Sequence, residues 1–119
     1  MNNVVKEKSF AFAVRVVHLY IYLCKEKKEF VLSKQLLRSG TAIGALVREP
    51  EQAESRADFI HKLSIALKEA NETDYWISLL RETKFLSPKE SASISSDNTE
   101  LLKLLTSIIK STKQGETQE

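Results

Sequence analysis

Apolar residues recur at intervals of three and four along four stretches of this 119-residue chain. Such spacing places them on one side of an α-helix, and runs that alternate in the manner of strands are nearly absent. The pattern predicts helices, joined by short connections, over residues 9–29, 31–49, 55–84 and 88–113. Four amphipathic helices in this order are typical of an all-α, antiparallel up-and-down four-helix bundle, with three helices and a loose tail as the alternative.

The first predicted helix is apolar on more than one side. One stripe comprises Phe10, Ala13, Val14, Val17, Ile21 and Cys24, and a second comprises Val16, Leu19 and Leu23. A helix with so wide an apolar face either lies at the centre of its own domain or shares a face with another chain. The same run, residues 10–24, is too short to cross a bilayer and contains Arg15 and His18, so no membrane partner is expected.

Two later helices begin at capping signals. Ser55 followed by Asp58, and Ser87 followed by Pro88 and Glu90, are patterns in which side-chain oxygens accept from the first backbone N–H groups of a helix. The third helix then carries a near-heptad seam, as expected of antiparallel packing. This seam comprises Phe59, Leu63, Ala66, Ala70, Thr73, Leu80 and either Trp76 or Ile77.

The fourth predicted helix contains weak helix formers in its first half. The segment SASISSDNT has poor helix propensity, so a break near Asp97 is considered before the apolar period resumes at Leu101. From Gly115 onward the chain is polar and terminal. We expect this tail, residues 115–119, to be disordered.

Gly40 and Gly44 stand four positions apart in a segment that otherwise suits a helix. Each interior glycine costs roughly 1 kcal/mol against alanine, so a close neighbour is expected. One interpretation is a break at Gly40 with a new helix from Thr41, but such a restart would favour Glu or Gln at position 44. We favour one continuous helix whose smooth face admits a second helix closely.

Composition and charge narrow the picture. The length suits one domain over residues 1–119, and the single cysteine, Cys24, excludes an intramolecular disulfide and is typical of the cytoplasm. Lys and Arg exceed Asp and Glu by nine to three in residues 1–48 (+6), whereas the acids lead by eight to five in 49–86 (−3) and by five to four in 87–119 (−1). This division can serve a polyanion, or it can join the basic half of one subunit to the acidic half of another.

Three segments make the chain recognisable. They are SFAFA at 9–13, LSKQLLRSGTAIGA at 32–45 and SRADFIHKLSIALKEANETDYW at 55–76. Together they closely resemble a four-helix-bundle protein family first noticed as open reading frames within intervening sequences of bacterial large-subunit ribosomal RNA genes. The match spans most of residues 9–80. The segment REPEQAES departs from the family pattern, which more usually has alanine where Pro50 stands.

The resemblance implies a four-helix bundle, and characterised relatives assemble as homopentameric rings. The resemblance extends to the accessory variability proteins of diversity-generating retroelements, which look similar in fold. Those proteins bind a reverse transcriptase and nucleic acid through a basic surface. The partners it implies are copies of the same chain, RNA or DNA, and a reverse transcriptase or another protein. A head-to-tail ring needs two different complementary faces, and the apolar first helix, the glycine face and the unequal charges are compatible with one.

The sequence contains no pattern of catalytic or cofactor-binding residues. Metal-ligand spacings, glycine-rich phosphate loops and nucleophile motifs are missing, so we expect neither a metal nor another cofactor. His18 and His61 lie on different helices, and Cys24 is interpreted as a small buried apolar residue. The sequence therefore predicts a protein that is not an enzyme.

One charged column follows the third helix beside its apolar seam. We predict that Glu69 and Glu72 in this column form a structural ionic cluster with Arg38 of the second helix, and an ordinary solvated face is the alternative. Paired carboxylates also occur in di-metal bundles. Those sites need a histidine three positions after a glutamate, and neither Glu69 nor Glu72 has one.

The densest basic cluster lies where the first helix gives way to the second. It comprises Lys25, Lys27, Lys28 and Lys34, with Arg48 further along. If the first two helices line one face of a ring, repetition would multiply this charge into a field that holds phosphate backbones without reading bases. A solvated turn is the alternative. We expect a non-enzymatic, ring-forming helical-bundle adaptor that binds RNA or DNA, and the alternative is a purely structural or protein-interaction oligomer.

Overall fold

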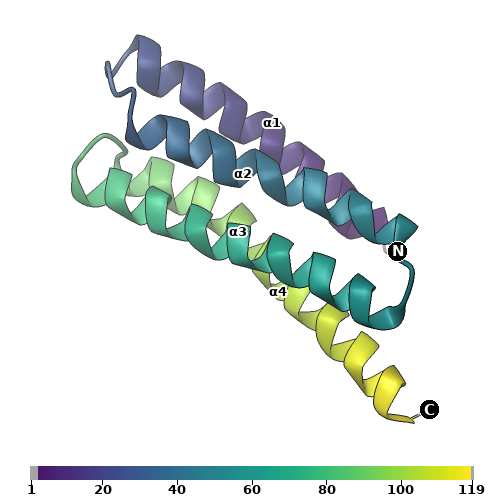
Figure 1. The fold of residues 1–119 in the computed structure, drawn as a ribbon. Coiled ribbons are helices and arrows are strands. Elements are labelled where there is room, and N and C mark those ends of the chain that lie inside the picture. The colour runs from purple at the N-terminus through teal and green to yellow at the C-terminus, as the bar shows by residue number, and fades with distance from the viewer. Residues whose placement is uncertain (1–2, 119) are drawn as a thin grey trace.

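The chain folds into four antiparallel α-helices, as the apolar period predicted. The computed structural model describes residues 3–118, and these residues contain no strand. The elements are α1 (Asn3–Lys25), α2 (Leu32–Arg48), a short 3-10 helix η1 (Glu49–Gln52), α3 (Arg56–Glu82) and α4 (Pro88–Gln118). Figure 1 shows α1 and α2 as one pair and α3 and α4 as the other, with the α1–α2 and α3–α4 connections at the same end.

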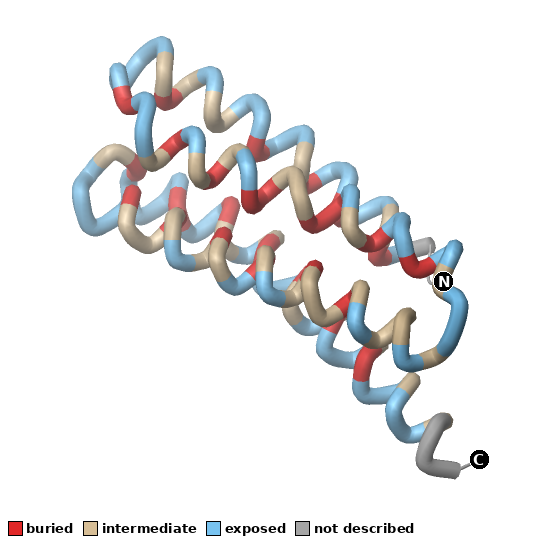
Figure 2. The backbone as a smooth tube through the Cα atoms, viewed as in Figure 1, coloured by how far each residue is buried: buried red, intermediate tan, exposed pale blue. Residues whose placement is uncertain are grey.

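A single apolar core runs along the inside of this bundle. Each helix contributes residues at alternating steps of three and four, and Figure 2 shows these buried positions facing inward along the tube. The fully enclosed large side chains include Phe12, Leu23, Leu36, Ile43, Leu63, Ile77, Leu80, Leu86, Leu101 and Leu105. Of the two residues considered for the seam of α3, Ile77 occupies the core position, because it is buried whereas Trp76 is half-buried.

Both predicted capping signals begin helices. The Ser55 hydroxyl accepts from the Asp58 N–H at 3.1 Å, which starts α3. At α4, the Ser87 hydroxyl accepts from the Glu90 N–H at 3.0 Å, and the Glu90 carboxylate accepts from the Ser87 N–H at 2.8 Å. These contacts satisfy backbone donors that a helix cannot satisfy internally, and they confirm the two predicted starts.

The prediction of 9–29 for the first helix is wrong at both ends. α1 begins at Asn3, because Val5 is fully buried and Lys6 forms an ion pair with Glu51 of η1, so the early turn packs on the rest of the chain. It ends at Lys25, because Lys28 adopts a left-handed backbone conformation with φ of 55°, which no α-helix can contain.

The predictions for the fourth helix also need correction. α4 continues through Asp97 without a break, and the adjacent Asn98 is fully buried and donates from Nδ2 to the Ala70 carbonyl at 3.0 Å. This tertiary contact outweighs the poor propensity of the segment. The helix also continues past Gly115 to Gln118, since extending a formed helix adds one hydrogen bond per residue, whereas Glu119 lies outside the described residues.

The second helix is continuous through both glycines, as favoured from the sequence. Gly40 faces Val16 of α1, where an added Cβ would lie 2.8 Å and 2.9 Å from the two γ-methyl carbons. Gly44 faces the backbone of Ser9, with 3.3 Å between an added Cβ and the Ser9 carbonyl oxygen. The neighbour that the glycines admit is therefore α1 of the same chain.

The end of the second helix falls one residue before the predicted boundary at 49. α2 stops at Arg48, and the 3-10 helix η1 follows with Pro50 near its start and buried. Proline suits this place because the first residues of a helix need no N–H partner. Among residues 3–118, no helix combines the length and the apolar character needed to cross a membrane.

Candidate functional site

The four predicted lysines lie together at one end of the bundle. Lys25 is the last residue of α1, Lys27 and Lys28 are in the turn, and Lys34 is in the first turn of α2. All four are exposed to solvent. The turn is compact because the N–H groups of Lys27 and Glu29 both donate to the Leu23 carbonyl, at 3.2 and 3.0 Å. We call this end of the molecule the loop end.

Arg48 does not belong to the loop end. It lies 14 positions after Lys34 on α2, which at 1.5 Å per residue places it about 21 Å further along the helix axis. There its guanidinium carbon lies 5.8 Å from the centroid of the Phe10 ring. The structure therefore separates the five predicted basic residues into a group of four and a single arginine that stacks on α1.

A second loop adds a lysine that sequence reasoning missed. The α3–α4 connection reaches the same end of the bundle, and it carries the exposed residue Lys84 (Figure 1). Lys28 and Lys84 both have positive φ angles, 55° and 67°. A left-handed conformation costs a lysine roughly 1 kcal/mol or more relative to glycine. Each of the two turns therefore keeps a lysine where glycine would be the favoured residue.

Three carboxylates partly offset the charge of the loop end: Glu26 and Glu29 lie in the turn after α1, and Glu90 lies in the first turn of α4. The Ser87 N–H that donates to Glu90 lowers the pKa of this carboxyl, and the positive charge of Lys27 lowers it further. This influence shows that the turn after α1 and the start of α4 are electrostatic neighbours. Glu90 is exposed and ionised at neutral pH, so together with Glu26 and Glu29 it leaves only a small positive excess on the five lysines of the loop end.

Two large apolar side chains are exposed among the lysines. The exposed fraction is 57% for Phe30 and 71% for Val31. Both lie between Lys28 and Lys34 in the chain. The sequence signal was available, since FV interrupts a charged run, but a helical reading of residues 31–49 assigned Val31 to a helix start and left Phe30 without a role.

Glu29 has a structural role that the sequence analysis did not identify. The residue is 8% exposed, and its carboxylate accepts from the N–H groups of Val31, Leu32 and Ser33, at 3.1, 2.9 and 2.6 Å. The Ser33 hydroxyl donates back to the Glu29 carbonyl at 2.7 Å. Burial by itself raises the pKa of Glu29, but the three backbone donors outweigh burial and hold the pKa below its usual value. Glu29 therefore caps α2 and remains ionised.

Arg38 contacts both of the carboxylates predicted for it. Its guanidinium lies 3.3 Å from Glu69 Oε2 and pairs with Glu72, whose Oε2 also accepts from the Trp76 indole N–H at 3.0 Å. Arg38 is half-exposed, while Glu69 and Glu72 are more buried. The cluster joins α2 to α3, and because two carboxylates surround its one cation, it offers no free positive charge to an anionic ligand.

The outer face of α1 is apolar and exposed, although the Arg48 guanidinium lies over the Phe10 ring at one end of it. Its exposed stripe comprises Phe10 (58%), Val14 (41%), Val17 (38%) and Ile21 (53%). Steps of four, three and four place these residues on one side of the helix, opposite the core residues Phe12, Val16 and Leu23. We call this the α1 stripe. α1 is therefore apolar on two sides, and only the side with Phe12, Val16 and Leu23 packs within the chain.

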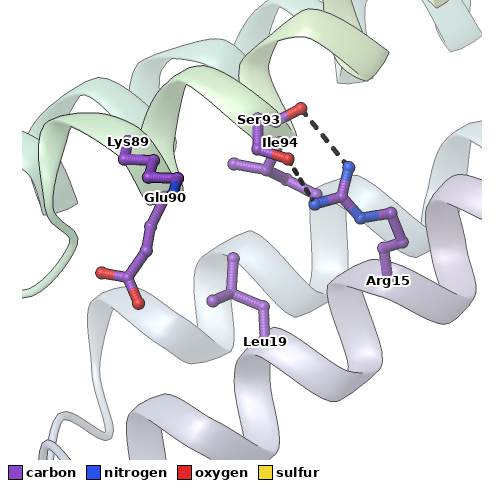
Figure 3. Close-up of a pocket in the computed structure, with 6 residues that line it drawn as sticks. All are labelled: Arg15, Leu19, Lys89, Glu90, Ser93 and Ile94. Atoms are coloured by element: carbon purple, nitrogen blue, oxygen red, sulfur yellow. Dashed lines mark hydrogen bonds between the residues drawn. The ribbon is translucent and has the colours of Figure 1, made fainter.

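A groove lies between α1 and α4. Its lining residues are Arg15, Leu19, Lys89, Glu90, Ser93 and Ile94. Figure 3 shows the Arg15 guanidinium bridging to Ser93, at 3.3 Å from the carbonyl and 2.9 Å from the hydroxyl. The same guanidinium lies 2.5 Å from Asp97. Because Arg15 already pairs with Asp97 and Ser93, its charge is not free to bind an anion in this groove.

The remaining reactive side chains do not converge. His18 and His61 are exposed on α1 and α3, and the Cys24 thiol is half-buried at 3.8 Å from the Ser33 hydroxyl. Within the part of the chain that the structure describes, no three His, Cys, Asp or Glu side chains are grouped so that they could hold a metal ion. The distinctive surfaces are therefore the α1 stripe and the loop end.

Comparison with known proteins is consistent with the observed fold. A family model described as 23S rRNA-intervening sequence protein matches residues 1–107. A solved structure of a protein with unknown function from the S23 ribosomal protein family of Bacteroides thetaiotaomicron VPI-5482 shares 63% identity with this chain. That match covers 89% of this chain and 98% of the other, with a TM-score of 0.87. No curated protein matches. Because the family model covers most of its length, the chain belongs to the 23S rRNA-intervening sequence protein family.

Proposed function

We propose that this protein is a non-enzymatic adaptor that assembles into a ring through its α1 stripe and binds RNA or DNA through the basic loop end. The single observation that carries the proposal is the separation of these two surfaces on one small bundle. The stripe lies along the side of the rod, and the lysines lie at one tip. One surface can therefore be buried by a second copy while the other stays open.

Self-assembly is supported by the uncovered apolar stripe. Four large apolar side chains on one helix face are more than the scattered apolar residues of an ordinary monomer surface, and such contiguous faces mark interaction sites. In a ring, the stripe of one copy packs against a different face of the next, so every copy uses both faces. The subunit number of five rests on the family resemblance.

Replacing two residues of the α1 stripe by glutamate tests this assembly. Val17→Glu together with Ile21→Glu places charge on the proposed interface while leaving the core residues of α1 untouched. We expect the double variant to have the 13.5 kDa mass of a single chain in light scattering. The matched control is Ala92→Glu with Ser96→Glu, which adds the same charges at the same spacing on the exposed face of α4. Loss of assembly in both variants, or in neither, would refute the role of the stripe.

Nucleic-acid binding is supported by the geometry of the lysines. In a cyclic assembly every copy is related to the next by rotation about one axis, so all loop ends lie at the same height and face the same side. Each copy then adds its lysines to one surface. Linked weak contacts of this kind raise the overall affinity well above that of a single site.

Salt dependence tests this binding directly. We expect fluorescence anisotropy to show binding to oligonucleotides of unrelated sequence, with an affinity that falls about tenfold or more when salt rises from about 50 to 200 mM. Lys27→Glu with Lys28→Glu should abolish binding. Lys103→Glu with Lys110→Glu makes the same change in charge on exposed α4 positions and should retain most of it.

The competing function is a structural oligomer in which the basic half contacts the acidic half of a neighbouring copy. This alternative rests on the charge difference between residues 1–48 and 49–86. It predicts that Lys27→Glu with Lys28→Glu lowers the mass in solution, whereas the adaptor proposal predicts an unchanged mass and lost nucleic-acid binding. One pair of measurements on one variant therefore separates the two functions.

A further inference from the structure

We infer that the loop end binds single-stranded nucleic acid, with the Phe30 ring as the platform on which a base stacks. This inference rests on the proposed nucleic-acid function and makes it specific. It is drawn from three observations at the loop end: an exposed aromatic ring, cations on both sides of it in the chain, and two lysines in strained backbone conformations.

The exposure of Phe30 is the first observation. With 57% of its surface in contact with water, the ring contributes little to the core, although a phenylalanine is among the residues that gain most from burial. The backbone at this position is held by the capped turn, because the Glu29 carboxylate accepts from the N–H groups of the three residues that follow Phe30. An exposed ring on an ordered backbone is suited to base stacking.

The second observation is the arrangement of charge around this ring. Lys27 and Lys28 precede Phe30, and Lys34 follows it on the first turn of α2. The same segment contains Glu26 and Glu29, and the Glu29 carboxylate is occupied by the backbone N–H groups that it caps. Single-strand-binding surfaces combine cations that contact the phosphates with aromatic rings that stack on the bases. A duplex keeps its bases stacked on one another and would use the lysines alone. The exposed ring therefore adds affinity for single strands and little for duplexes.

The third observation is that Lys28 and Lys84 occupy left-handed backbone positions in the two loops of this end. Glycine would relieve both turns, so the lysines weaken the fold slightly where they stand. Strained backbone conformations of this kind cluster at functional sites in proteins. Both loops lie at the same end of the bundle (Figure 1), so Lys84 adds a cation from the α3–α4 loop to those of the α1–α2 turn.

A single strand fits these features better than a lipid surface does. Membrane attachment grows with the apolar area that is inserted, and the loop end offers one phenylalanine and one valine, with the carboxylate of Glu90 nearby. One ring is sufficient to stack one base, and each further copy would supply another. The occupant to which the inference commits is therefore a single-stranded polynucleotide.

The test compares Phe30→Leu with the unaltered protein on single-stranded and double-stranded DNA of about 20 nucleotides, a length that exceeds the footprint of most single-strand sites. Leucine keeps an apolar side chain at this exposed position and removes the ring. We expect the affinity for the single strand to fall at least about fivefold and the affinity for the duplex to change less than about twofold. Val31→Ala is the matched control, since it trims the neighbouring exposed residue without removing a ring, and it should bind as the unaltered protein does.

The strained lysines provide a second test. Lys28→Gly and Lys84→Gly remove charge but relieve the backbone, so both variants should melt at or above the temperature of the unaltered protein while binding the single strand more weakly. A fall in melting temperature would show that these lysines serve the fold, and it would remove the third observation from the argument.

The outcomes separate this inference from the proposed function. If Phe30→Leu lowers single-strand and duplex binding equally, or lowers neither, while Lys27→Glu with Lys28→Glu abolishes both, the stacking inference fails and the nucleic-acid function stands. If the unaltered protein binds no DNA or RNA of either form at low salt, both fail. Binding to vesicles of anionic phospholipid with no binding to single strands would also overturn the inference.

Discussion

At the scale of single residues, Glu29 shows how one side chain can organise a turn. Val31 occupies the N-cap position of α2 and has no side-chain oxygen with which to cap it. The carboxylate of Glu29, two residues earlier, supplies the acceptor and takes three N–H groups at once. The negative charge also lies at the positive end of the helix dipole. The turn that presents Phe30 therefore depends on an ionised carboxylate.

We predict that Glu29→Gln lowers the free energy of unfolding by about 1–2 kcal/mol at pH 7, because it removes the charge from a buried cap that accepts three hydrogen bonds. The folded-state pKa of Glu29 is lowered, so its contribution is complete above the ordinary carboxyl range and is lost as the pH falls through the folded value. Urea unfolding at neutral and acidic pH measures this difference.

The control for that prediction is Glu26→Gln. Glu26 lies one turn earlier, is exposed and carries the same charge. Its substitution should change the stability by less than about 0.5 kcal/mol at either pH. If the two variants lose equal stability, or if the deficit of Glu29→Gln persists at acidic pH, the carboxylate is not the cap that the geometry indicates.

At the scale of elements, the contact between α1 and α2 is set by the two glycines. Val16 projects toward Gly40, and the backbone of Ser9 approaches Gly44. Two helices can approach this closely only where one of them lacks side chains at the crossing. The glycines therefore weaken the helix propensity of α2 and in return allow dense packing against α1.

Gly40→Ala is expected to lower the free energy of unfolding by about 1 kcal/mol. The new methyl group would lie within 3 Å of both γ-carbons of Val16, and this overpacking, at about 1–3 kcal/mol, exceeds the roughly 1 kcal/mol that alanine contributes to a helix. In a Val16→Ala background the opposing methyl groups are absent, so the same substitution should become stabilising. Thermal and urea unfolding of the four proteins in this cycle measure the reversal.

Gly115 provides the internal comparison. It is also helical, but the nearest atom to an added Cβ is 4.0 Å away. Gly115→Ala should therefore raise the stability slightly or leave it unchanged. A loss of stability in Gly115→Ala equal to that in Gly40→Ala would contradict the explanation by close packing.

At the scale of the whole molecule, apolar and cationic surfaces are directed to different sides. The bundle is a rod 53 Å long and about 20 Å wide, with the α1 stripe along its length and the lysines at its loop end. Apolar contacts strengthen or stay constant as salt increases, whereas contacts with phosphates weaken through counterion release. The two proposed interactions should therefore respond to salt in opposite ways.

We predict that raising sodium chloride from about 0.1 to 0.5 M leaves the mass of the assembly unchanged and releases bound nucleic acid, because the Debye length falls well below 10 Å over this range. Light scattering and fluorescence anisotropy on the same samples measure the two effects. Dissociation of the assembly at high salt would instead show that the basic and acidic halves hold the subunits together.

Much of the fold could be predicted from the sequence. The four helices, the capped starts at Ser55 and Ser87, and the continuity of α2 follow from local rules, since a cap or a helical period depends on residues a few positions apart. The weak propensity before Asn98 misled the same rules, because a buried hydrogen bond from α4 to α3 decides that segment. The family was also recognisable from the ordered motifs of residues 9–80.

The surfaces depended on tertiary structure. The sequence determined that α1 has two apolar sides, but only the positions of the other helices decided that Val16 is covered and Val17 is not. Helical spacing likewise placed Arg48 on the same element as Lys34, whereas the length of α2 separates the two residues. Folding brings Lys84 from a distant segment of the chain to the loop end. Periodicity specifies an angle around one helix axis, and burial depends on which other helices occupy that direction.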